Sequence, residues 1–236
     1  MVAKSKRKAP APADDTAKTK RVTRSSTAAA GSSTAEDVRP PAHANEEAPP
    51  SGKSCTGGNG KIVAFLRGVN VGGRVHSMKS IADALGKAGL CNVETFLASG
   101  NVIFDSPSDA AGDEASVLAI EQRVEDALEK LFGAHIPVFA RSMSDVAQLG
   151  ERIVKTSTAV NVVLVKEELT REQQDILDAL ATDADELKPL DKAFVWYSAT
   201  KMSESPLFKI ALDKKLGVPV TVRTVNTLRR IVKKFG

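Results

Sequence analysis

The chain has 236 residues, of which 42% are hydrophobic and 26% are charged, and its net charge is +4. No apolar run approaches the roughly 20 residues that a membrane-spanning helix needs, so we expect no membrane association. Two cysteines, Cys55 and Cys91, are too few for a disulfide framework, and the three histidines have no partner at helical spacing. We therefore expect a reducing compartment, no metal site and no cofactor.

The N-terminal segment 1–60 lacks aromatic residues and is rich in Ala, Pro, Ser, Thr and Lys, which predicts a disordered tail. Its basic clusters at 4–8 and 18–21 resemble a bipartite nuclear-localisation signal, and a solvated, weakly DNA-adhesive tail is the alternative. The protein is accordingly expected inside the cell, in the nucleus if the source is eukaryotic and otherwise in the cytoplasm.

Alternation between apolar runs and helical periodicity predicts the elements of residues 61–155. In chain order, they are a strand Lys61–Arg67, a helix between Ser77 and Gly89, strands Asn92–Ala98 and Asn101–Asp105 joined by a two-residue hairpin turn, a helix Glu114–Phe132, a strand Ile136–Ala140 and a helix Ser144–Val154.

The same order recurs in residues 160–236. The elements are a strand Asn161–Val165, a helix from Thr170 to Leu180, strands Glu186–Leu190 and Ala193–Ser198, a helix Pro206–Leu216, a strand Val220–Arg223 and a helix Val225–Phe235. Each half thus reads βαββαβ followed by an extra helix. We predict an α+β fold in which residues 61–236 form a duplicated domain of two ferredoxin-like halves.

The loop after the first strand, Arg67-Gly68-Val69-Asn70-Val71-Gly72-Gly73, leads toward Lys79. Glycines let a backbone approach a ligand closely, and amides near a helix N-terminus favour an anion. The loop matches neither common nucleotide-binding motif, so a tight turn that merely needs glycine is the alternative. Two interpretations likewise remain for Ser99-Gly100-Asn101: the segment forms only a hairpin turn, or Ser99 and Asn101 supply hydrogen-bond donors beside the first loop.

These motifs resemble those of an uncharacterised family, DUF1697. The similar residues are Arg67 to Gly73, Met78, Val93 to Thr95, Ser99 to Phe104, Ser205, Lys209, Lys215 to Gly217 and Thr221 to Thr227. The resemblance covers about Lys61 to Lys234 and implies a duplicated α+β fold but no activity. Thr224 and Val225 stand where the family pattern has Asn and Trp.

Function is predicted as binding of a small molecule or anion in a cleft between the halves, with enzymatic activity left open. The candidate ligand-binding residues are Arg67, Gly68, Asn70, Gly72, Gly73, Lys79, Ser99, Asn101, Lys209, Arg223, Asn226 and Thr227. Each of Arg67 and Arg223 ends a strand and precedes a loop with Asn, so we expect comparable positions in the two halves, facing one anion or each paired with a carboxylate.

Two alternatives remain. The acid-free end of the chain after Asp213 carries seven basic residues, so the tail and the last helix could contact nucleic-acid phosphates. Phe194 and Trp196 lie on one face of a strand and Tyr197 on the other, which gives little support to an aromatic base-stacking platform. A structural or interaction role is the other alternative, and the sequence does not indicate an oligomeric state.

Overall fold

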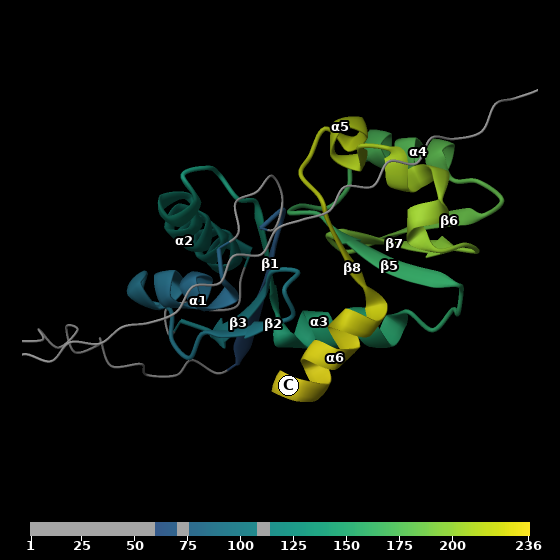
Figure 1. Ribbon diagram of the computed structural model, residues 1–236. Coiled ribbons are helices and arrows are strands. Elements are labelled where there is room, and N and C mark those ends of the chain that lie inside the picture. The colour runs from purple at the N-terminus through teal and green to yellow at the C-terminus, as the bar shows by residue number, and fades with distance from the viewer. Residues whose placement is uncertain (1–59, 70–75, 108–113) are drawn as a thin grey trace, which may run out of the picture. The chain divides into compact units, whose positions relative to one another are not determined.

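The computed structural model describes residues 60–69, 76–107 and 114–236 (Figure 1). The predicted tail, its basic clusters and the candidate residues Asn70, Gly72 and Gly73 lie outside the described residues. The boundary placed at residue 60 therefore stays a prediction.

The first half contains four strands and three helices. In chain order they are β1 (Lys61–Leu66), α1 (Met78–Lys87), β2 (Glu94–Phe96), β3 (Asn101–Asp105), α2 (Glu114–Phe132), β4 (Val138–Ser142) and α3 (Met143–Arg152). Ser77 caps α1 by accepting a hydrogen bond from the Ser80 amide, and Ser142 caps α3 through a capping box with Asp145.

The second half repeats the order with short 3₁₀ turns added. Its elements are β5 (Ala159–Leu164), α4 (Arg171–Leu180), β6 (Asp185–Leu190), β7 (Ala193–Ser198), η1 (Met202–Glu204), η2 (Pro206–Lys209), α5 (Leu212–Leu216), β8 (Thr221–Thr224) and α6 (Val225–Phe235). Thr170 caps α4 and Thr224 caps α6. Thus α3 and α6 are the extra helices predicted after each βαββαβ unit.

Two four-stranded antiparallel sheets result, with strand orders β2-β3-β1-β4 and β6-β7-β5-β8. Each sheet is packed with helices, which confirms the α+β fold class and the repeated element order. The strand registers show which residues of the two halves are equivalent. Val63 of β1 pairs with Arg141 of β4, and Val162 of β5 pairs with Arg223 of β8 in the same way. Among the described residues, no helix is long and apolar enough to cross a membrane.

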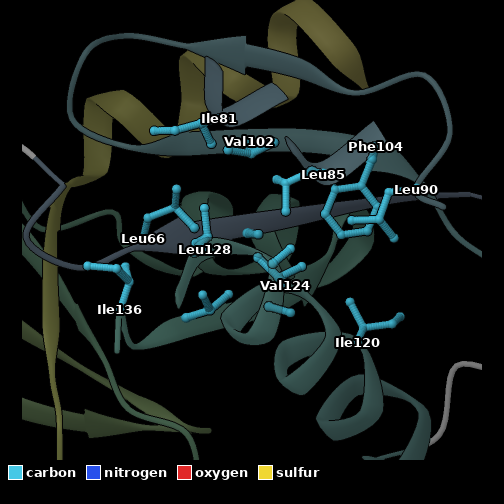
Figure 2. Packing of buried hydrophobic residues seen from close by; sticks show 14 of the residues in the cluster. Leu66, Ile81, Leu85, Leu90, Val102, Phe104, Ile120, Val124, Leu128 and Ile136 are labelled. Carbon is cyan, nitrogen blue, oxygen red and sulfur yellow. The ribbon is translucent and has the colours of Figure 1, made fainter. Parts of the chain in front are cut away.

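Three apolar cores follow from strict alternation along the strands. Ile62, Ala64 and Leu66 face a core with α1 and α2 (Figure 2), while Val63 and Phe65 face the opposite side. This second core is shared between the halves, since it also contains residues of β5, β7, α3 and α6. The third core joins the other face of β5 and β7 to α4, η2 and α5. Each sheet is therefore buried on both faces.

Two local expectations are wrong. The strand predicted at 92–98 is only Glu94–Phe96, and a four-residue turn replaces the two-residue hairpin, because Leu97 takes a positive φ of 60° and ends the pairing. The helix predicted at 206–216 is broken at Ile210, whose extended backbone separates η2 from α5.

Strand β7 is buried on both faces. All six residues of Ala193–Ser198 are buried. Phe194 and Trp196 pack into the third core, and Val195 and Tyr197 pack into the shared core. Neither face of this strand can stack bases, which strengthens the sequence-based argument against an aromatic platform.

Candidate functional site

Arg223 on β8 lies at the contact between the halves and is 8% exposed. Its Nε donates to Oδ1 of Asn101 at 2.7 Å, and its Nη2 donates to the carbonyls of Leu66 and Ser99 at 2.8 and 2.9 Å. Nη1 donates to Thr221 Oγ1 and to a carbonyl of its own strand. The guanidinium therefore fastens the last strand of the second half to the end of β1 and the β2–β3 turn.

This arginine has no carboxylate among its described partners. Burial lowers the pKa of Arg223 to about 10, so the side chain is charged at neutral pH and its charge is spread over neutral oxygens. Asn101 is fully buried, and its Nδ2 donates to the Phe96 carbonyl and to Ser99 Oγ. Arg223, Asn101 and Ser99, which were predicted as ligand-binding residues, are thus brought together in a hydrogen-bonded cluster.

Arg141 on β4 is the equivalent residue of the first half, and it is 5% exposed. Its Nη2 donates to the carbonyls of Val165 and Lys192, which belong to the second half. Leu66 and Val165 are also equivalent, since the Leu66 amide donates to the Gly100 carbonyl and the Val165 amide donates to the Lys192 carbonyl at the corresponding turn. The two arginines therefore make reciprocal contacts, each binding the strand end and hairpin turn of the other half.

The sequence analysis missed Arg141, although a signal was present. Both arginines are the penultimate residue of a final strand and are followed by the helix-capping Ser142 or Thr224. The expectation that Arg67 and Arg223 hold comparable positions is wrong, because the registers make Arg223 equivalent to Arg141.

Arg67 is instead equivalent to Lys166, which likewise follows the end of a central strand. Arg67 Nη2 forms an ion pair with Asp213 of α5 at 2.7 Å. Lys166 Nζ forms one with Glu125 of α2 at 2.6 Å and lies 3.6 Å from Glu121. Each cation thus pairs with a carboxylate of the other half. For Arg67, this is the alternative in which the arginine is paired with a carboxylate rather than facing an anionic ligand.

Other predicted residues lie apart from the Arg223 cluster. Lys79 is exposed in the first turn of α1, and Lys209 is exposed at the end of η2. Asn226 and Thr227 lie in the first turn of α6, where Asn226 is exposed. Gly68 is exposed with a positive φ. Whether these residues bind a ligand stays a prediction.

A basic surface lies on α6 beside β2 and is called here the α6 basic face; it consists of Lys61, Arg230, Lys233 and Lys234. The guanidinium of Arg230 stands 5.2 Å from the ring centre of Phe96, and Lys234 Nζ stands 5.7 Å from the same ring and 4.7 Å from that of Phe235. Lys61 Nζ donates to the Phe235 carbonyl at 3.1 Å. The face therefore combines cations with an aromatic pair.

A surface groove of about 260 Å³ lies at Arg141, between α3, the loop after β5 and the β6–β7 turn. Its charged lining consists of Arg141, Arg152, Lys192, Asp145, Glu168 and Asp191. Neither its cations nor its acids were singled out by sequence. In the part of the chain that the structure describes, no cluster of His, Cys, Asp and Glu could hold a metal ion.

The repeated element order and the two antiparallel sheets define a duplicated α+β domain. The family model "protein of unknown function (DUF1697)" matches residues 60–195, and the chain belongs to this family. The match ends before the similar residues at 205–227, which remain a resemblance. No curated protein matches the chain.

One solved structure with the same fold is that of a conserved bacterial protein from Streptococcus pneumoniae. It is 19% identical with a TM-score of 0.53, and the alignment covers 74% of this chain and 97% of that protein. At this identity the likeness concerns the fold alone.

Proposed function

We propose that the domain binds a phosphate-bearing ligand on the α6 basic face. The observation that carries the proposal is that Lys61, Arg230 and Lys234 converge on one aromatic pair, while no carboxylate is described as a partner for any of them. Uncompensated charge of one sign raises the local concentration of ions of the opposite sign and steers their approach.

Four cations elsewhere in the described chain differ from those of the α6 basic face. Arg67, Lys155, Lys166 and Lys188 each form an ion pair with an Asp or Glu. Arg230, Lys233 and Lys234 have the i, i+3 and i+4 spacing at which like charges destabilise a helix by about 0.2 to 0.5 kcal/mol per pair. The helix dipole favours Lys233 and Lys234 in the last turn by about 0.3 to 1 kcal/mol each, which offsets this repulsion. The support for an anionic partner is therefore the placement of Arg230 and Lys234 against the same aromatic ring.

The face is held in place from behind. Leu228, Ile231 and Phe235 bury the opposite side of α6 in the shared core. Phe96 meets Phe235 edge to face with ring centres 5.8 Å apart, and Arg230 lies against Phe96. A guanidinium restrained by an aromatic ring loses less freedom when it donates to a phosphate than a free side chain would.

The phosphate could belong to a small molecule or to a nucleic-acid backbone, and binding measurements separate the two. Fluorescence anisotropy with labelled single-stranded and duplex oligonucleotides would test the polymer, and calorimetry with inorganic phosphate and ATP would test small anions. The Arg230→Ala, Lys234→Ala double variant of the full chain is expected to weaken binding about tenfold or more and to reduce the slope of log K against log salt by about 0.7 to 0.9 per lost phosphate contact.

The matched control is Lys188→Ala, which removes an exposed cation that is paired with Glu186. It is expected to bind as wild type does. The predicted tail stays unchanged in every variant, so its contribution cancels. Equal binding by the double variant and the control, or no binding of any probe by wild type, would refute the proposal.

A further inference from the structure

The groove at Arg141 contains a hydrogen-bond donor without a described partner. Arg141 donates through Nη1 to the Ala140 carbonyl and through Nη2 to the carbonyls of Val165 and Lys192, whereas no bond from its Nε is described. Arg141 lines the groove although it is only 5% exposed. Its Nε is thus the guanidinium nitrogen left to donate to a ligand there.

The other half shows what such an Nε binds. There Arg223 Nε donates to the amide oxygen of Asn101 at 2.7 Å. The position equivalent to Asn101 is Ala193, because Asn101 pairs with Phe65 as Ala193 pairs with Leu164. A methyl group cannot accept a hydrogen bond, so an oxygen from outside the chain is needed to complete the contact at Arg141.

Acidic side chains share the groove with this donor. Asp145, Glu168 and Asp191 are exposed and line it, and none of them is described in an ion pair with a Lys or Arg. Arg152, at the end of α3, adds a second cation to Arg141. The groove thus presents cationic and anionic groups together, unlike the α6 basic face, and it is smaller than the roughly 300 to 1,000 Å³ typical of pockets for drug-sized ligands.

We infer that the groove binds a small zwitterion, either a free amino acid or a dipeptide. Its carboxylate accepts from Arg141 Nε and is attracted by Arg152, and its ammonium group lies against the carboxylates of Glu168 and Asp191. A buried arginine that is already held by carbonyls is well oriented for a carboxylate, since charged hydrogen bonds of this kind are short and strong. This site is independent of the α6 basic face, because the two share no residue.

Calorimetric titration of the full chain with L-alanine and L-alanyl-L-alanine tests the inference and separates the free amino acid from the peptide. Propionate and ethylamine each retain one of the two charged groups. Both are expected to bind at least about tenfold more weakly than the zwitterion, which corresponds to about 1.4 kcal/mol. Propionate binding as tightly as L-alanine, or no heat with either zwitterion at millimolar concentration, would overturn the inference.

Variants test the geometry. Ala193→Asn gives Arg141 Nε a side-chain amide acceptor like the one that Asn101 provides for Arg223 Nε. It should therefore abolish ligand binding while the arginine itself is retained. Glu168→Gln and Asp191→Asn should each weaken binding about threefold, and the neighbouring Glu167→Gln should leave it unchanged. If the buried Ala193→Asn variant does not fold, the exposed Glu168 and Asp191 variants decide: unaltered affinity in both contradicts the proposed site.

Discussion

The two arginine junctions between the halves are built alike but completed differently. Arg223 and Arg141 occupy equivalent positions, and each donates to carbonyls at a strand end and hairpin turn of the other half. At Arg223 the chain supplies the acceptor for Nε from Asn101, whereas at Arg141 it supplies Ala193. The two halves therefore share the contacts to backbone carbonyls that fasten them together, and they differ in the residue opposite Nε, which is Asn101 in one case and Ala193 in the other.

The surroundings of the two junctions differ in electrostatics as well. Glu121, which is 2% exposed, lies 3.9 Å from Arg141 and accepts a hydrogen bond from the Ala140 amide. Glu125 accepts from the Val138 amide in the same way. These carboxylates satisfy outward-facing amides of β4, an edge strand that would otherwise offer unpaired groups. No side-chain carboxylate is described at Arg223, which relies on neutral acceptors alone.

The largest expected effect distinguishes the two arginines. Arg223→Ala leaves several buried oxygens without a donor, so we expect it to lower the free energy of unfolding by about 3 to 5 kcal/mol. Arg141→Ala removes fewer described hydrogen bonds and should cost about 1 to 2 kcal/mol less. Urea unfolding followed by fluorescence of the single tryptophan, Trp196, measures both.

If Arg141→Ala lowers the free energy of unfolding as much as Arg223→Ala does, the two junctions do not differ in strength as expected. Should Arg223→Ala fail to fold, Asn101→Ala gives a second test, because it removes the acceptor of Arg223 Nε together with two hydrogen bonds that Asn101 Nδ2 donates within the β2–β3 turn. Arg223→Lys is expected to rescue little of the loss, since an ammonium cannot reach acceptors along the fork of a guanidinium.

The sequence predicted elements whose signals are local. Strand β7 and helices α2 and α6 have the predicted bounds, because alternation and helical periodicity are contained within each segment. The edge strand β2 was overextended, since the turn begins at Leu97, an apolar residue whose positive φ no pattern indicates.

The junction itself could not be derived in this way. Arg223 binds Leu66 and Asn101 across sequence separations of 157 and 122 residues. The sequence singled out Arg223, Asn101 and Ser99 but not their mutual contact. The sequence alone does not distinguish a buried arginine that binds backbone carbonyls from an exposed arginine that binds an anion, because the difference depends on how the side chain is packed.

The next prediction compares how the stabilising effect of two buried acids, Asp185 in the second half and Glu121 in the first, depends on pH. Burial raises the pKa of Asp185, but hydrogen bonds from Trp196, Ser198 and Ser205 outweigh it and hold the pKa below 3.8. Its stabilising contribution is therefore present above pH 3.8 and is lost as the pH falls through the folded-state pKa. At neutral pH we expect Asp185→Asn to cost about 1 to 3 kcal/mol, and to cost less in strong acid.

Glu121 in the first half is expected to behave in the opposite sense. Burial raises its pKa above 4.5, although the Ala140 amide, Lys166 and Arg141 oppose the shift. Its contribution is full below pH 4.5 and is lost as the pH rises through the folded-state pKa. The stability of Glu121→Gln relative to wild type should thus increase with pH from about 4.5, and unfolding at a series of pH values with the exposed Glu129→Gln as control measures it. A parallel pH course for the Asp185 and Glu121 variants would contradict the contrast.

The last comparison concerns Gly100 and Lys192, the turn residues whose carbonyls accept hydrogen bonds from Arg223 and Arg141 respectively. Gly100 has a φ of 80°, and a Cβ there would lie 2.9 Å from Val69 Cγ2 and 3.1 Å from Leu66 Cβ. Its equivalent Lys192 takes a φ of 47° with a side chain already present. Gly100→Ala should therefore lower the free energy of unfolding by about 1 to 3 kcal/mol through strain and close contact, whereas Lys192→Gly should change it by less than about 1 kcal/mol. Thermal and urea unfolding of the two variants decides, and similar losses at both positions would mean that the turns carry equal constraints despite the different spacing around them.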